Sequence, residues 1–246
     1  MAGHSKWANI KHRKARQDAA KGKTWSKCSR AIIVAARHGG GDPEFNLALR
    51  YAIDEAKAAN MPKDTIEKAI RRGTGESGAE AFEEARYEGY GTAGVAVIVD
   101  CLTDNVNRAA AEMRKLFEKH GGNLAKPGAV AFGVEQVGLL LVEAVSVNED
   151  QLMEAALEAG ADDVKEAGGA WEVICPPGDL HAVRDAIVAA GITPASAEVT
   201  MLPQTTVPCD AQRAAKVLRL LDALDDHDDV QRVYHNAEIP EEVMAE

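Results

Sequence analysis

The chain lacks closely spaced cysteines and any long apolar run. Its four cysteines are far apart in 246 residues and form no C-x-x-C pair. Zinc sites need such pairs, so we expect four reduced thiols, most of them buried. No apolar run approaches the roughly 18 residues of a membrane span, and no apolar stretch follows the basic N-terminus as in a secretory signal. These absences indicate a cytoplasmic protein that does not enter a membrane.

The sequence also has little that indicates catalysis or a cofactor. Residues 89–94 (GYGTAG) match G-x-G-x-x-G, but a dinucleotide site needs a helix after the glycines. A strand is expected at 95–101 instead, which favours a glycine-rich hairpin turn. No spacing suggests a catalytic triad. We therefore expect no catalytic residues, no cofactor and no enzyme activity.

Three acidic pairs are candidate metal ligands. None has the ligand spacing of a calcium loop, so a solvated acidic surface is the better interpretation and no metal is expected. The pairs are Asp162-Asp163, Asp225-Asp226 and Asp228-Asp229.

Charge is distributed very unevenly. The first 38 residues contain ten Lys or Arg and a single acid, Asp18, giving +9 in a chain of net charge −11. Residues 73–246 contain 12 bases and 32 acids, a balance of −20. One end is thus suited to a polyanion and the remainder repels it. This pattern is typical of a protein that binds nucleic acid.

The basic segment supplies the candidate nucleic-acid contacts. A solvated surface or a site for an acidic protein is the alternative, but His4, Trp7 and His12 lie among the cations, and rings can stack on bases. Trp25 is expected in the core instead, and Trp7 is the better contact. The proposed phosphate contacts are Lys6, Lys11, His12, Arg13, Lys14, Arg16, Lys21, Lys23, Lys27 and Arg30.

Helical periodicity is clear from residue 24 onward. At about 100° per residue, one face of 24–38 carries Trp25, Cys28, Ile32, Ala35 and Ala36. The other face forms a cationic ridge of Lys23, Lys27, Arg30 and Arg37. Residues 8–21 are polar on every side, and a helix without an apolar face has nothing to dock. We expect that segment to be mobile or weakly packed in the free protein.

Two further helices are expected before residue 74. Gly39-Gly40-Gly41 ends the first helix, and Asp42 is expected as the next N-cap, with Pro43 at the first helical position. The buried stripe of that helix would be Phe45, Ala48, Leu49, Ala52, Ile53 and Ala56. The last helix opens near Pro62, buries Ile66, Ala69 and Ile70, and ends at Gly73.

The pattern changes after the polar glycine-rich joint at 73–80. Strands are expected at 83–90, 95–101 and 129–135, with a helix at 104–119 capped by Asp104 or Thr103. Residues 137–202 show the order β-α-β-β-α-β, the ferredoxin-like signature. A strand near 204–208, a helix at 210–224 and a strand at 229–235 follow. These last elements can pair with residues 80–135 if the ferredoxin-like unit is inserted in a middle domain.

This organisation predicts an all-α N-terminal domain followed by two α+β domains. The boundaries are 1–78 for the basic helical domain, 79–135 with 204–246 for the discontinuous middle domain, and 136–203 for the inserted acidic ferredoxin-like domain. RNA-recognition motifs share that topology but stack bases on sheet aromatics. Trp171 is the only aromatic residue in this unit, so a structural or protein-contacting role is favoured.

Long segments of the sequence resemble the YebC family of bacterial proteins. They include MAGHSKWANIKHRKARQDAAKGK, GGGDPEFNLALRYAIDEAKAANMPKDTIEKAIRRGTG, YEGYGTAG, LTDNVNRAAAEMRKLFEKHGGNL, EAGADDV and DDVQRVYHN. The match runs from Met1 to about Asn236 and departs at a few positions. The family commonly has proline and glycine at Thr92 and Ala93, glycine at Ala125, and a bulky aliphatic at Cys28.

The resemblance implies a non-enzymatic role and the three-domain arrangement described above. Bacterial relatives are described as DNA-binding transcriptional regulators. A mitochondrial relative is similar to a translational activator, and some bacterial members are linked to ribosomes stalled on proline-rich sequence. Two functions therefore stay open: a transcriptional regulator on duplex DNA, and a ribosome-associated translation factor that contacts rRNA or tRNA. The acidic domains would offer surfaces to protein partners.

Overall fold

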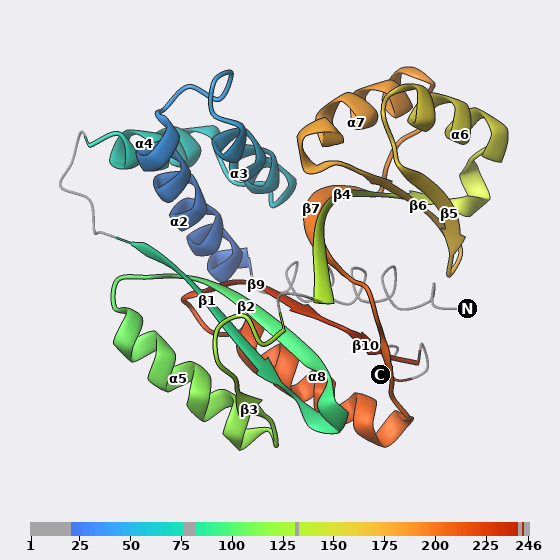
Figure 1. Ribbon diagram of the computed structural model, residues 1–246. Coiled ribbons are helices and arrows are strands. Elements are labelled where there is room, and N and C mark those ends of the chain that lie inside the picture. Colours follow the sequence, from blue (N-terminus) through green and yellow to red (C-terminus); the bar gives the residue numbers. More distant parts are fainter. Residues whose placement is uncertain (1–20, 76–81, 131–132, 241–242, 244–246) are drawn as a thin grey trace. The chain divides into compact units, whose positions relative to one another are not determined.

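The computed structural model describes residues 21–75, 82–130, 133–240 and 243 (Figure 1). The described chain divides into two compact units. The first unit runs from the first described residue to Val130 and also contains Ala215–His235. The second unit runs from residue 133 to Ala214 and also contains the described residues from Asn236 onward. Within the described residues, no helix is both long and apolar enough to cross a membrane.

The first unit begins with three helices: α2 (Lys21–Gly39), α3 (Leu47–Ala58) and α4 (Lys63–Gly73). Ile32 of α2 and Leu49 of α3 are completely buried between them, as the apolar periodicity predicts. The crossing of α2 and α4 is close at Gly73. A Cβ at that position would lie 2.5 Å from the Ile33 carbonyl oxygen, so the contact requires glycine.

The predicted start of α3 is wrong. Asn46, not Asp42, is the N-cap, and its side chain accepts a hydrogen bond from the Leu49 N–H at 3.1 Å. Asp42 instead accepts from the Glu44 N–H at 2.9 Å, which closes a turn before the helix. Both residues are good caps, and the turn displaces the helix start by several residues. Phe45 therefore lies outside α3 and is exposed, rather than part of a buried stripe.

The same unit contains a four-stranded antiparallel sheet of order β3-β1-β2-β9. Its strands are β1 (Glu83–Tyr90), β2 (Ala96–Thr103), β3 (Asn123–Leu124) and β9 (Val230–His235). The G-x-G-x-x-G segment joins β1 to β2 as a hairpin in which Tyr90 pairs with Ala96. A short 3₁₀ turn (Thr92–Gly94) makes the connection, and Ala93 adopts φ 65°. The hairpin interpretation is confirmed.

Two other predicted boundaries in this unit are wrong. Helix α5 (Val106–Lys119) is capped by Asn105, which accepts from the Arg108 N–H at 3.0 Å, and not by Asp104 or Thr103. No strand covers 129–130, because the buried Glu88 carboxylate accepts the N–H groups of Gly128 (2.8 Å) and Val130 (2.6 Å). Amides bound in this way are not available to a sheet, and the next strand begins at Val134.

The second unit has its own four-stranded antiparallel sheet, of order β5-β6-β4-β7. Along the chain the elements are β4 (Val134–Glu143), α6 (Glu149–Glu158), β5 (Asp163–Ala167), β6 (Ala170–Cys175), α7 (Leu180–Ala189) and β7 (Ser196–Pro203). Short 3₁₀ turns occupy Ala144–Ser146 and Pro177–Asp179. Strands β8 (Val207–Pro208) and β10 (Ala237–Glu238) pair in parallel, and α8 (Ala211–Asp225) leads back to the first unit.

The protein is thus a multidomain arrangement of helices and antiparallel sheets, as the sequence predicts at that level.

Candidate nucleic-acid interface

The predicted phosphate contacts divide between two parts of the sequence. Six of them lie outside the described residues: Lys6, Lys11, His12, Arg13, Lys14 and Arg16. The expectation that residues 8–21 are weakly packed also falls almost entirely outside this range. The remaining four are in α2, which Lys21 opens and which carries Lys23, Lys27 and Arg30.

The cations of α2 contact an acidic turn at the end of α8, which we define as residues 225–229. Lys27 Nζ donates to the Asp225 carbonyl oxygen at 2.5 Å and lies 3.3 Å from its carboxylate. Lys23 Nζ donates to the Asp226 carbonyl oxygen at 3.1 Å. The final carbonyls of a helix carry partial negative charge and lack helical partners. Two lysines of one helix therefore bind the C-terminal end of another.

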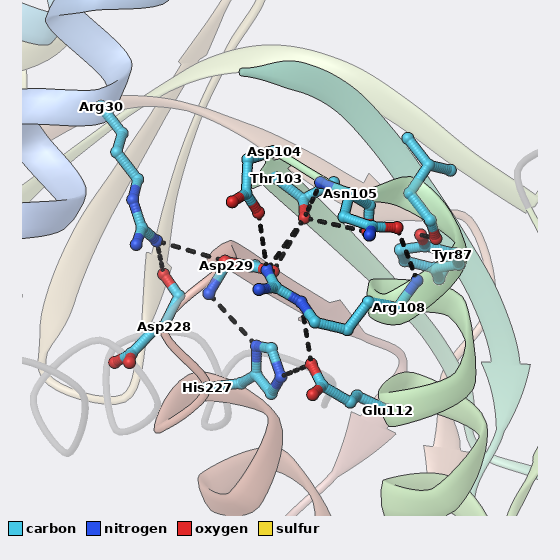
Figure 2. Close-up of polar contacts among 11 residues, drawn as sticks. Arg30, Tyr87, Thr103, Asp104, Asn105, Arg108, Glu112, His227, Asp228 and Asp229 are labelled. Carbon is cyan, nitrogen blue, oxygen red and sulfur yellow. Dashed lines mark hydrogen bonds and ion pairs between the residues drawn. The ribbon is translucent and has the colours of Figure 1, made fainter. Parts of the chain in front are cut away.

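Arg30 extends the same contact by one turn of α2. Its guanidinium donates to the Asp228 carbonyl oxygen and lies 3.5 Å from the Asp229 carboxylate (Figure 2). Its Cζ is also 5.4 Å from the centre of the Phe82 ring, within cation–π distance. Lys27 and Arg30 are only 16% and 24% exposed. Much of the predicted cationic ridge is accordingly committed to partners within the chain.

Asp229 lies at the centre of this network. Its carboxylate accepts from the Thr103 hydroxyl at 2.8 Å and from Arg108 Nη2 at 2.6 Å (Figure 2). Hydrogen bonding to Asp229 raises the pKa of Arg108. Asp229 and Thr103 are both buried. The interpretation of Asp228-Asp229 as a solvated acidic surface is therefore wrong for Asp229, because a buried carboxylate is stable only when it is paired and hydrogen-bonded.

Three of these residues also form the geometry of a possible metal site. Potential ligand atoms of Glu112, His227 and Asp229 lie within 4.8 Å of one another. His227 Nδ1 accepts from the Asp229 N–H at 3.1 Å, and its Nε2 is 2.9 Å from Glu112. The Arg108 guanidinium contacts Asp229 at 2.6 Å and Glu112 at 3.8 Å. An internal cation already balances the carboxylates, so we assign no metal here.

A second set of cations lies on α4. Lys63 is 3.8 Å from Glu67 on the same helix. Lys68, Arg71 and Arg72 are exposed, and none of them forms an ion pair within the described part of the chain. The sequence shows these bases in a cluster, but nothing in the local pattern distinguishes them from the cations of α2. The two sets differ because the acidic turn binds the cations of α2.

None of the four cysteines is a candidate reactive residue. All four are free and buried, as expected. Burial raises the pKa of Cys28 and of Cys101 to about 12, and that of Cys175 to about 11. Reactive cysteines need a lowered pKa and exposure, so these thiols are inert in the folded chain.

Cationic helices lie near the N-terminus, and the two antiparallel sheets belong to the acidic remainder of the sequence. These features define a class of multidomain protein with a strongly basic N-terminal part. Two family models cover nearly all of this chain. "TACO1/YebC protein N-terminal domain" matches residues 5–76, and "TACO1/YebC second and third domain" matches residues 82–237. The chain belongs to the TACO1/YebC family, which confirms the resemblance seen in the sequence.

Full-length relatives agree with this assignment. A protein of Dictyoglomus turgidum named "Probable transcriptional regulatory protein" is 54% identical over 245 residues, covering 99% of this chain and 98% of that protein. One of the same name from Rubrobacter xylanophilus is 54% identical over 248 residues, covering 100% and 99%. The crystal structure of the conserved hypothetical protein Aq1575 from Aquifex aeolicus has a TM-score of 0.83 at 47% identity, over 96% of this chain and 98% of that one.

Proposed function

We propose that this protein is a non-enzymatic regulator of gene expression that binds nucleic acid through its basic N-terminal part. The observation that carries the proposal is the separation of charge, +9 in the first 38 residues against −20 beyond residue 72. Phosphates would bind the first part and be repelled by the second, which orients the complex. The favoured target is duplex DNA in a transcriptional role. In support of that role, relatives of this chain are named probable transcriptional regulatory proteins.

The proposed contacts fall into two groups. Eight precede residue 24 in the sequence, and we propose that these meet phosphate directly: Lys6, Lys11, His12, Arg13, Lys14, Arg16, Lys21 and Lys23. Lys23 is exposed, and its present acceptor is a single carbonyl oxygen. Lys27 and Arg30 would first have to leave the acidic turn. We propose that they contact phosphate only when that turn is displaced.

The proposal includes a division of the chain into three domains. It places a basic helical domain at 1–78, a middle α+β domain at 79–135 and 204–246, and an inserted ferredoxin-like domain at 136–203. The strand order of the second sheet, β5-β6-β4-β7, supports the ferredoxin-like interpretation. The acidic domains would contact protein partners in the cytoplasm.

A charge-removal variant tests the proposal. Replacing Lys11, Arg13, Lys14 and Arg16 with Ala should abolish binding of duplex DNA while leaving the circular dichroism spectrum unchanged. The matched control removes four exposed bases from α5 and from the loop after β3: Arg114, Lys115, Lys119 and Lys126. For the unmodified protein, about six phosphate contacts predict a slope of about −5 for log affinity against log salt. Binding that survives in the first variant, or a flat salt response, contradicts the proposal.

A ribosome-associated translation factor remains the second candidate, because the family resemblance includes translational activators. Phosphate contacts position a protein without identifying the nucleic acid. Crosslinking in cells, scored for rRNA against promoter DNA, separates the two. Enrichment of rRNA without promoter signal rejects the transcriptional role, and the reverse result rejects the translational one.

A further inference from the structure

The loop between α2 and α3 displays an aromatic side chain to solvent. Phe45 is 85% exposed, and Leu47, two residues later, is 43% exposed. Large apolar side chains in this position lose the stabilisation that burial would give them. An exposed aromatic ring is available to a ligand, and such rings stack on the bases of nucleic acids.

Hydrogen bonds hold the loop that carries Phe45, and they involve residues before and after Phe45 in the chain. Asn46 is buried, and its side-chain amide donates to the carbonyl oxygens of Ala35 and Gly40, each at 2.8 Å. Arg50 donates to the carbonyl oxygens of Pro43 (3.0 Å) and Glu44 (3.1 Å). The backbone around Phe45 is therefore ordered before any ligand binds, which lowers the entropic cost of using the ring as a contact.

The same loop packs beside the C-terminal end of α4. A methyl group placed on Gly41 would lie 2.9 Å from Thr74 Cγ2 and 3.2 Å from Ile70 Cγ2. Arg71 and Arg72 lie between these two residues in sequence, and both are exposed. They form no ion pair with the rest of the described chain, in contrast to Lys27 and Arg30 on α2. Cations without internal partners are the ones immediately available to a phosphate.

We propose that Phe45, Arg71, Arg72 and Lys68 form a contact for unpaired nucleotides. One base would stack on the exposed ring of Phe45, and the adjoining phosphates would meet the two arginines and Lys68. Stacking of bases on aromatic rings beside a basic groove is how proteins bind single strands with little sequence preference. This contact rests on the proposed nucleic-acid function and adds a second kind of ligand to the favoured duplex: a single-stranded segment, a loop or an unpaired end.

The charges around the ring favour an unpaired base over a duplex. Asp42 and Glu44 precede Phe45 in the loop and are both exposed, so the immediate surroundings of the ring do not attract phosphate. A duplex presents mainly phosphates to an approaching protein, and its bases are already stacked. An unpaired base can reach the ring with its face while its own phosphates stay on the α4 side.

Substitution of Phe45 tests this contact directly. Binding of the full-length protein is measured by fluorescence anisotropy with two labelled probes: an oligouridine of about 12 nucleotides and a blunt DNA duplex. Phe45→Ala should weaken oligouridine binding about tenfold and leave duplex binding unchanged. Phe45→Trp should retain affinity, and its added fluorescence should be quenched by the oligouridine. Arg71→Ala with Arg72→Ala should also weaken oligouridine binding.

Val145→Ala is the matched control, because Val145 is an apolar side chain 97% exposed in the other unit. It should change neither affinity. Equal affinities for Phe45→Ala and the unmodified protein, or equal losses with both probes, would overturn the contact. If Phe45→Ala has no effect while replacing Lys11, Arg13, Lys14 and Arg16 with Ala abolishes binding, this contact fails and the general function stands. If the unmodified protein binds neither probe, the general function fails as well.

Discussion

Replacing Asp229 with Ala should destabilise the contact between α2 and the acidic turn. The Asp229 carboxylate joins three elements, since it accepts from Thr103 of β2, from Arg108 of α5 and faces Arg30 of α2. Alanine removes every one of these interactions without adding bulk. Asp228, its neighbour, offers the matched control: it is exposed, and it meets Arg30 through its backbone carbonyl, which alanine retains.

The expected loss can be estimated bond by bond. The hydrogen bond from the buried Thr103 hydroxyl to a charged acceptor contributes about 2 kcal/mol. The Arg108 bond is short, at 2.6 Å, but that side chain is 45% exposed, so solvent screens the interaction and it adds little. Arg30 adds little, because it keeps the Asp228 carbonyl. The expected loss is about 2 kcal/mol for Asp229→Ala and below about 0.5 kcal/mol for Asp228→Ala.

Trp25 provides the measurement, since its indole N–H donates to the Ala59 carbonyl oxygen at 3.0 Å within the helical part. In a background with Trp7→Phe and Trp171→Phe, its fluorescence follows unfolding of that part in urea. With a slope of about 2 kcal/mol per molar, Asp229→Ala should lower the midpoint by about 1 M. Equal midpoints for the two variants would refute the reasoning, because they would show that the buried carboxylate contributes no more than an exposed one.

Three further predictions follow from individual residues. Ala93→Gly should stabilise the protein by about 1 kcal/mol, because Ala93 is held at φ 65°, where glycine is unstrained; a lower melting temperature would contradict this. Burial lowers the pKa of His235 to about 4, so the unfolded chain binds this proton first as pH falls. The neutral His235 therefore contributes to the free energy of unfolding fully above pH 6.5, and this contribution, at most about 3 kcal/mol, is lost as pH falls towards 4. In urea titrations across that range, the free energy of unfolding of His235→Gln should depend less on pH than that of the unmodified protein. At pH 8 a thiol reagent should label the native protein far more slowly than the urea-unfolded chain, and early labelling would contradict the burial of Cys28, Cys101, Cys175 and Cys209.

Local patterns in the sequence were sufficient for most of the helices and strands. The apolar positions of α2, including Cys28 and Ile32, are buried as their spacing predicts. Strand β1 begins and ends at the predicted residues, Glu83 and Tyr90. These elements depend on periodicity within about ten residues, which the sequence shows directly.

Features that depend on choices between similar residues were predicted less well. Asp42 and Asn46 are both suitable N-caps, and so are Asp104 and Asn105. In each case the residue nearer the helix is the cap, and the other is a flanking residue. The loop at 128–130 forms because Glu88, about 40 residues away, takes its amides. No short-range pattern contains that information.

The contact between α2 and the acidic turn lies furthest from what a sequence pattern can show. Lys27 and Asp225 are 198 residues apart. The sequence does contain two complementary signals, a cationic ridge at helical spacing and four acids within 225–229. Complementary charge does not identify the partner, however, because the same ridge also fits a phosphate backbone. Only the folded structure shows which cations already have internal partners.

The acidic turn has a consequence for how salt acts on binding. A protein cation that neutralises a phosphate releases the small cations condensed around that phosphate, and this release makes binding depend on salt. Lys27 and Arg30 already neutralise carboxylates of their own chain. A phosphate that displaced these carboxylates would release cations while the freed carboxylates took cations up, so the net release would be small. The slope of log affinity against log salt should then depend only on the cations that precede Lys27, even if Lys27 and Arg30 also contact phosphate. A turn that serves as an internal counterion makes part of the interface insensitive to ionic strength.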